Sequence, residues 1–276
     1  MSGLNASLGY FSVVACASLG TRLLLRRWAF VSEFTAAFAL AAFRLEVDTI
    51  AEVGQWAGAL GRDVAITMLF ISIAVHAILM QDSTGNPSLT LMGLLQKEIS
   101  VASATLSVAA QFFGAFVAIA VAAKFWEMEL SDMHMVKNLM WFECSTSLRV
   151  GVLQGALVEG VSALGFYLIF LVLKSRSQLL RIPVLALMLT FIAYAANDYT
   201  SGYVNPSLAY AMTFTCPGSS YLEYSLVYWI APVIGMTVAL FLFLGNLPLL
   251  FSRKLLYSRK SRFRAPKAKA SEEKTS

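Results

Sequence analysis

Two asparagines offer the clearest chemistry in this chain, because both stand in the same tetrapeptide: Asn86-Pro87-Ser88-Leu89 and Asn205-Pro206-Ser207-Leu208. Asn is among the best N-cap residues, since its side-chain oxygen accepts a backbone N–H of the first helical turn, and Pro fits the first helical position. Each of these two boxes therefore predicts the start of a helix. The positive end of a helix and a side-chain amide are both groups that can interact with a polar solute.

The helices that the boxes begin are short, covering residues 88 to about 96 and 207 to about 214. At about 1.5 Å per residue, each crosses roughly half of a ~30 Å bilayer core. Two such half-helices that meet tip to tip make one composite span, with both positive ends and both amides at the middle of the membrane. Non-helical backbone at that depth is tolerated only inside protein or along a water-filled cavity, so the boxes indicate a pore or a binding site.

A pair of acidic residues repeats together with the boxes. Glu33 and Glu159 each lie on the first apolar segment of one half of the chain, upstream of that half's box. A carboxylate is costly in lipid unless it faces the protein interior and has partners. A buried carboxylate can accept backbone N–H groups from the irregular loop that leads into a half-helix. We therefore interpret both acids as structural supports for the boxes.

Composition places the chain in the membrane. It has 276 residues, of which 58% are hydrophobic and 13% charged, with a mean hydropathy of +0.69. These values are typical of an integral membrane protein. The net charge of +5 comes mainly from the tail, residues 252–276. A basic segment beside a span is attracted to anionic lipid, so we expect contact with lipid and no nucleic-acid partner. The three cysteines are too few and too scattered for a zinc site, and no metal or cofactor is implied.

Six strong apolar segments are long enough to be spans, and the boxes follow the second and the fifth of them. Three spans and one half-helix form a unit, and the odd number of crossings inserts the second unit upside down relative to the first. The sequence thus predicts an all-α membrane domain, 28–251, with inverted repeats at about 28–123 and 151–250. The spans are predicted at 28–44, 64–80, 101–123, 151–173, 182–197 and 225–250.

Loop charges predict the orientation. The 174–181 connection holds Lys174, Arg176 and Arg181 and no acid, whereas the 47–63 connection is mainly acidic. The positive-inside rule makes the first connection and the basic tail cytosolic. Residues 1–27 hold an extra apolar stretch, 5–25, whose positive charges follow it instead of preceding it as in a signal peptide. We interpret it as an uncleaved helix and expect it to span, which would place the N-terminus on the non-cytosolic side.

From about residue 28 to 250 the chain resembles an aquaporin. The order of Glu, box, Glu and box is that of the family, and so is the stretch from Asp198 through Gly202 before the second box. Both boxes depart from the usual Asn-Pro-Ala, and Cys216 lies nine residues after Ser207. This combination is similar to the unorthodox intracellular branch called superaquaporins. The N-terminal residues 1–5, the 129–132 loop and the 262–266 segment resemble one vertebrate member of that branch.

The resemblance implies a passive channel with one pore per chain, which conducts water and small uncharged solutes such as glycerol. It also implies a homotetramer in an intracellular membrane, such as that of the endoplasmic reticulum or vesicles. Asn86 and Asn205 would donate amide hydrogens to the oxygen of a passing water, and the dipoles of the half-helices would oppose cations and protons.

The resemblance also implies an unusual outer constriction. In a typical water channel an Arg follows the second box, where it narrows the pore and offers donors and a positive charge. Here that residue is Leu208, and the other lining positions fall on Ala193, Gly202 and, in the second span, Phe70. We therefore expect a constriction that is wider and more apolar than in a strict water channel. We interpret Cys216 as a structural packing residue, and a disulfide with Cys144 stays open.

Two other classes of protein remain as alternatives. A secondary transporter shares inverted repeats and broken helices, but the spans lack the chains of acids or bases expected for ion coupling. A closed or vestigial pore acting as a membrane scaffold is also compatible, since an apolar ring can dewet. No nucleophile and base pair appears, so an enzyme is not expected. For two further polar side chains on spans, we interpret His76 as a packing residue and Trp126 as an interfacial anchor.

Overall fold

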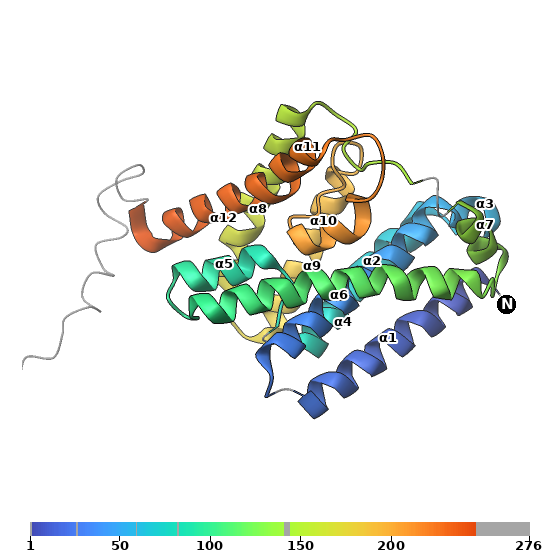
Figure 1. Ribbon diagram of the computed structural model, residues 1–276, viewed down its shortest axis with the longest axis horizontal. Helices are drawn as coiled ribbons and strands as arrows, with labels where there is room; N and C mark the ends of the chain where they lie inside the picture. The colour runs from blue at the N-terminus through green and yellow to red at the C-terminus, as the bar shows by residue number, and fades with distance from the viewer. Residues whose placement is uncertain (1, 26, 59, 82, 141–143, 247–276) are drawn as a thin grey trace, which may run out of the picture.

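The computed structural model describes residues 2–246 except residues 26, 59, 82 and 141–143. In these residues every regular element is a helix, which confirms the predicted all-α class (Figure 1). The predicted basic tail, 252–276, lies outside the described residues. The helices are α1 (Gly3–Leu25), α2 (Ala29–Glu52), α3 (Gly54–Ala57), α4 (Arg62–Met80), α5 (Pro87–Leu95), α6 (Val101–Glu127), α7 (Asp132–Met140), α8 (Val152–Leu173), α9 (Gln178–Ala195), α10 (Pro206–Thr213), α11 (Tyr221–Ser225), η2 (Leu226–Ile230), α12 (Ala231–Phe241) and η3 (Leu242–Asn246).

Among the described residues six helical segments are long and apolar enough to cross a membrane, and α2 is not one of them. These six are α1, α4, α6, α8, α9 and the continuous segment Tyr221–Gly245. The helix α2 occupies the first predicted span and continues to Glu52, beyond the predicted end at residue 44. It carries several charged residues, but it packs against α1, α4 and α6, so most of its surface faces protein. Charged side chains can lie at this depth because they find partners inside the bundle.

The two halves repeat the same close contact between helices, as the inverted-repeat prediction requires. In the first half α6 meets α2 at Gly114, where an added Cβ atom would collide with the carbonyl oxygen of Phe34. In the second half α12 meets α8 at Gly235, where an added Cβ atom would collide with the carbonyl oxygen of Gly160. Glycine is needed at both places because only it lets the backbones approach so closely. Phe34 and Gly160 directly follow the two repeated acids, so the contacts lie at matching positions.

The extra helix α1 lies along α2 and α4, with its first residues near α7 (Figure 1). Its buried side chains recur every three or four positions, and its opposite face is apolar and exposed at residues such as Leu8 and Leu23. Near its other end Arg22 donates hydrogen bonds to the carbonyl oxygen of Leu79 and to the side chain of Gln81. The ends of α1 and α4 therefore lie together. The start of α1 meets the end of α2 through Ser7 and Glu46, so α1 runs antiparallel to α2 along the bundle.

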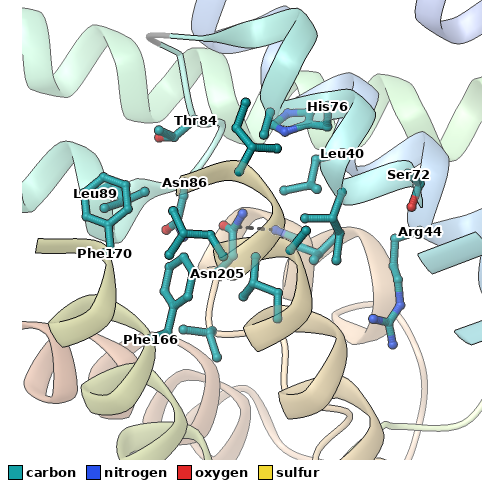
Figure 2. Close-up of a pocket in the computed structure, with 18 of the residues that line it drawn as sticks. Leu40, Arg44, Ser72, His76, Thr84, Asn86, Leu89, Phe166, Phe170 and Asn205 are labelled. Carbon is teal, nitrogen blue, oxygen red and sulfur yellow. Dashed lines mark hydrogen bonds between the residues drawn. The ribbon is translucent and has the colours of Figure 1, made fainter. Parts of the chain in front are cut away.

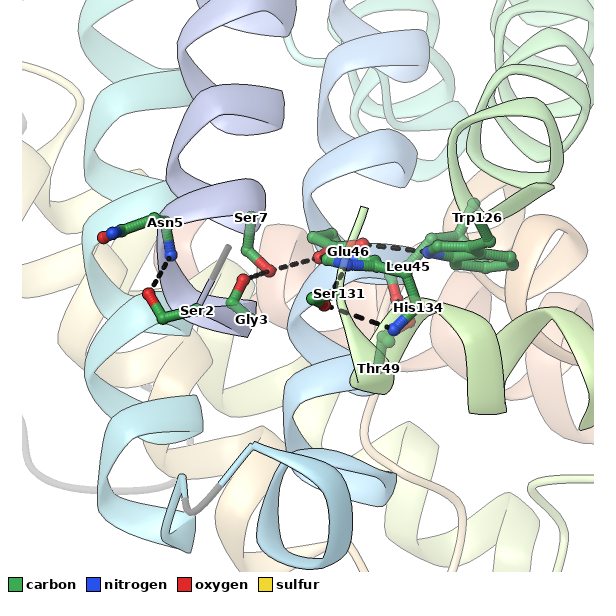
Figure 3. A network of polar contacts seen from close by, with 10 residues as sticks. All are labelled: Ser2, Gly3, Asn5, Ser7, Leu45, Glu46, Thr49, Trp126, Ser131 and His134. Atoms are coloured by element: carbon green, nitrogen blue, oxygen red, sulfur yellow. Dashed lines mark hydrogen bonds and ion pairs between the residues drawn. The ribbon is translucent and has the colours of Figure 1, made fainter. Parts of the chain in front are cut away.

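Glu46, near the end of α2, is the centre of a buried polar network that holds α1 in place (Figure 3). Its Oε1 accepts a hydrogen bond from Ser7 Oγ of α1 and lies 2.8 Å from Nε2 of His134 in α7. Its Oε2 accepts a hydrogen bond of 2.9 Å from Nε1 of Trp126 at the end of α6. Ser131 Oγ lies 2.7 Å from Nδ1 of His134 and completes the chain of contacts. Trp126 is therefore buried in the protein, and the anchoring role predicted for it is wrong, because its ring does not face the lipid.

We expect the N-terminus to lie on the opposite side of the membrane from the 174–177 connection, because α1 is antiparallel to α2 and about 35 Å long at 1.5 Å per residue. An epitope tag fused to the N-terminus should resist protease in intact microsomes and be digested once detergent opens them. The same tag on the C-terminus serves as the control and should be cut in intact vesicles. Digestion of the N-terminal tag in sealed vesicles would contradict a spanning α1.

Candidate functional site: a cavity at the meeting point of two half-helices

The half-helices α5 and α10 begin with the predicted caps. Asn86 Oδ1 accepts a hydrogen bond of 2.9 Å from the Ser88 N–H, and Asn205 Oδ1 accepts one of 3.0 Å from the Ser207 N–H. The two starts are also bonded to each other, since Asn205 Nδ2 and Ser207 Oγ both donate to the carbonyl oxygen of Gly85, at 3.1 and 2.7 Å. The positive ends of two half-helices therefore meet tip to tip. The box residues at this meeting point are Asn86, Pro87, Ser88, Asn205, Pro206 and Ser207.

A tyrosine that the sequence analysis did not single out bridges the two loops. Tyr167 of α8 is fully buried, and its hydroxyl accepts a hydrogen bond of 3.1 Å from Asn86 Nδ2 and donates one of 2.9 Å to the carbonyl oxygen of Val204. An amide group has two N–H donors, so the bonds to Tyr167 and Gly85 each use one. Within the described residues one N–H of Asn86 and one of Asn205 are left over. These two N–H groups can donate to a solute.

The repeated acids lie behind the loops that lead into the boxes. Glu33 Oε2 accepts hydrogen bonds from the Gly85 N–H at 3.0 Å and from Gln111 Nε2 at 2.7 Å. Glu159 is fully buried in the second half and accepts three hydrogen bonds. Its donors are Thr200 Oγ1 at 2.8 Å, the Tyr203 N–H at 3.0 Å and the Val204 N–H at 2.9 Å.

The loop that Glu159 contacts holds unusual backbone conformations. Ser201 and Val204 have φ angles of +66° and +54°, in the left-handed region that residues other than glycine rarely adopt. A positive φ is a genuine outlier for a β-branched residue such as Val204. Such conformations persist only where the surroundings determine them, and here the hydrogen bond from the Val204 N–H to Glu159 does so directly.

A cavity of about 300 Å³ passes the two boxes (Figure 2). One end is lined by Lys174 and Arg181, at the connection between α8 and α9. We call the face of the bundle that holds this connection the basic face. The middle is lined by Asn86 and Asn205 together with apolar side chains of α2, α4, α8 and α9. The other end is lined by Arg44, by Leu69 of α4, by Ala193 near the end of α9 and by the loop before the second box. The wall therefore follows the bundle from one face towards the other and is mainly apolar, with a few polar groups.

Three of the four residues predicted at the outer constriction line this cavity: Ala193, Gly202 and Leu208. Phe70 does not line it, and its neighbour Leu69 does, because consecutive residues of a helix point about 100° apart. The predicted packing residue His76 lines the cavity as well. Its Nε2 lies 2.9 Å from the carbonyl oxygen of Ala36, so the buried ring has a partner.

Cys144 and Cys216 form a disulfide, with their Cα atoms 5.2 Å apart, instead of packing as free thiols. The bond ties the segment before α8 to the end of α10. The same segment is held by the Ser147 N–H, which donates to Thr213 Oγ1 at 2.8 Å, and by the Ser147 hydroxyl, 2.8 Å from the Tyr203 hydroxyl. This fixed segment therefore supports the wall of the cavity at Tyr203.

Comparison with known proteins agrees with this arrangement. Residues 24–243 match the family described as Major intrinsic protein, which leaves most of α1 outside the match. Aquaporin-12 of Mus musculus is 39% identical over 278 residues, covering 98% of this chain and 96% of that protein. Aquaporin-11 of Homo sapiens is 26% identical, covering 80% of this chain and 79% of that protein. These relatives confirm the predicted resemblance to the superaquaporin branch.

A solved structure shows the same fold. The X-ray structure of the aquaglyceroporin from Plasmodium falciparum matches with a TM-score of 0.62 and 18% sequence identity, covering 80% of this chain and 96% of that one. The family match, the relatives and the paired half-helices all lead to one conclusion. The chain is a multi-pass membrane protein that belongs to the major intrinsic protein family, whose members are channels and not enzymes.

Proposed function

We propose that this chain is a passive channel for water and small uncharged solutes such as glycerol, and that the cavity at the half-helices is its pore. The observation that carries the proposal is the position of Asn86 and Asn205 in one cavity wall, each with an amide N–H left for a passing oxygen. Both asparagines also sit at positive helix ends, which disfavour a cation at the same point. We further propose that Glu33 and Glu159 support the boxes and do not contact the solute.

The location and assembly of the channel are part of the same proposal. We place it in an intracellular membrane such as that of the endoplasmic reticulum or vesicles, with the basic face and the tail in the cytosol and the protein as a homotetramer. The disulfide supports this orientation, because Cys144 and Cys216 lie at the face opposite the basic one, where an oxidising lumen would preserve the bond. The similarity to aquaporin-11 and aquaporin-12 supports the choice of branch.

Light scattering of proteoliposomes tests the proposed solute class. We expect fast, unsaturable water flux and measurable glycerol flux, because Ala193, Gly202 and Leu208 leave the constriction with little bulk. Leu208→Arg should lower the ratio of glycerol to water flux several-fold, since it adds a long charged side chain to the wall. Leu179→Arg is a matched control on the exposed start of α9 and should leave the ratio unchanged.

The outcomes separate the alternatives. Water flux with complete exclusion of glycerol would contradict the proposed width of the pore. Saturable or ion-dependent flux would indicate a transporter. Flux of neither solute would favour a closed pore, for which the mainly apolar wall supplies a physical reason, because an apolar constriction can dewet.

A further inference from the structure

We propose that Arg44 is the selectivity residue of this channel, and that α2 thereby supplies the cation which the position of Leu208 lacks. The proposal rests on the proposed channel function and deepens it. It also qualifies the sequence-based expectation that the outer constriction is wider and more apolar than in a strict water channel, because Arg44 lines the same cavity as Leu208, Ala193 and Gly202.

The depth of Arg44 matches that of Leu208. Arg44 lies one helical turn beyond Leu40 on α2, and Leu40 lines the cavity near the middle (Figure 2). Leu208 lies three residues from the cap Asn205 on α10, so Leu208 and Arg44 are about 4.5 Å and about 6 Å beyond the central part of the wall. The buried cluster of Val47, Leu69 and Ala193 lies one turn farther along α2. Arg44 therefore lies between the central part of the wall and the level of Ala193, at the Leu208 end of the cavity.

The guanidinium of Arg44 is held from two sides. Its Nε donates a hydrogen bond of 2.8 Å to Asp48 Oδ1, and its Cζ lies 5.5 Å from the ring centroid of Tyr203. Tyr203 is itself fixed by the contact of its hydroxyl with Ser147 and by the bond of its N–H to Glu159. Only 11% of the Arg44 side chain and 22% of the Asp48 side chain are exposed. A long side chain held in this way has already lost most of its rotamer freedom, so it can act as a fixed part of the wall.

The donors of Arg44 are not exhausted by these contacts. A guanidinium has five N–H donors, and the bond to Asp48 uses the one on Nε. With the described residues the terminal nitrogens Nη1 and Nη2 make no hydrogen bond, and Arg44 lines the cavity. These nitrogens can therefore donate to the oxygen of a water or an alcohol. The carboxylate of Asp48 reduces the positive charge of Arg44 that a distant ion would feel. It contacts only Nε, so the terminal nitrogens stay available to the solute.

The plain alternative is that Arg44 serves only as an ion-pair partner of Asp48 within α2. Two variants distinguish the roles in proteoliposomes. Asp48→Asn removes the ion pair but keeps the guanidinium and an acceptor oxygen for its Nε, so we expect a much smaller change in the ratio of glycerol to water flux than removal of the guanidinium causes. Arg44→Met combined with Asp48→Asn removes the guanidinium without leaving an unpaired carboxylate. It should raise the ratio several-fold and admit sodium, which we expect the wild type to exclude.

Arg44→Lys gives a third measurement in a protein that keeps the charge and a possible partner for Asp48. We expect it to keep sodium out but to raise the ratio of glycerol to water flux, because Lys lacks the planar fork and its stacking on Tyr203. If wild type conducts and both Arg44 variants keep its ratio and its sodium exclusion, the selectivity role of Arg44 is wrong while the channel function stands. If folded wild type conducts neither water nor glycerol, both proposals fail.

Discussion

Replacing Glu159 with Gln should sharply lower the yield of folded channel. Glu159 accepts from the N–H groups of Tyr203 and Val204 on different oxygens, and it also accepts from the Thr200 hydroxyl. An amide has only one acceptor oxygen, so in Gln the NH₂ group would face at least one backbone N–H. A buried donor left without an acceptor costs about 1–3 kcal/mol, and more where the lost partner was charged.

The loss should be larger than one hydrogen bond suggests, because the same contact holds a strained backbone. Val204 has a φ of +54°, and Ser201 has one of +66°. Conformations of this kind cost about 1–3 kcal/mol each and relax when the contacts that impose them are removed. The loop would then no longer present Asn205 at the tip of α10. We therefore expect the whole second half-helix to be mispositioned, and most of the protein to be lost to aggregation or degradation.

Size-exclusion chromatography of the solubilised protein measures the folded fraction, and proteoliposome flux per folded protein measures what survives. Glu127→Gln is the matched control, because that carboxylate is 57% exposed and pairs only with the exposed Lys124 among the described residues. It should behave as wild type. A Glu159→Gln protein that folds normally but conducts a different set of solutes would show that the acid acts on the permeant instead of the loop.

The boxes and the acids could be found in the sequence because their signals are local and repeated. An Asn followed by Pro favours a helix start, and two copies in register with Glu33 and Glu159 predicted the half-helices, which the structure has at α5 and α10. The extent of α2 could not be found in the same way. Hydropathy treats its charges as a reason to end a span, whereas the fold surrounds this helix with α1, α4 and α6.

Residues that act through partners far away in the sequence were missed. Arg44 could have been noticed through its spacing of four residues from Asp48, which places the two on one helix face. That spacing does not reveal which face lines a pore. Tyr167 and Glu46 gave no signal at all, because their partners come from segments whose positions depend on the complete fold.

Replacing Glu46 with Gln should release α1 from the rest of the bundle. The carboxylate accepts from Ser7 and Trp126 on different oxygens and contacts Nε2 of His134, and all four side chains are buried. Gln can keep its oxygen towards Ser7 and His134 or towards Trp126, but not both. The expected cost is again about 1–3 kcal/mol for the group that loses its acceptor.

The effect should concentrate on α1, because among the described residues the bond between Ser7 and Glu46 is the hydrogen bond that ties the start of this helix to the rest of the protein, while Arg22 anchors the other end. The remaining contacts at the start are apolar, chiefly Tyr10 against Phe125 and Phe11 against Phe43. The exposed apolar face of α1 suits lipid, so a released helix can remain in the membrane without its contacts to α2. We therefore expect separation of α1 before any unfolding of the channel domain.

A thiol placed at the buried position Val14 reports this separation. In a Cys16→Ser background, Val14→Cys should react slowly with maleimide, since Val14 is only 3% exposed and packed against the bundle. Addition of Glu46→Gln should accelerate the reaction by about tenfold or more, which corresponds to about 1.4 kcal/mol in the opening equilibrium. Glu52→Gln is the control on the same helix, because its carboxylate is 60% exposed and pairs with Lys137 at the surface. Equal labelling in the Glu46 variant and the control would show that apolar packing alone holds α1, and that the buried network serves α7 and the end of α6 instead.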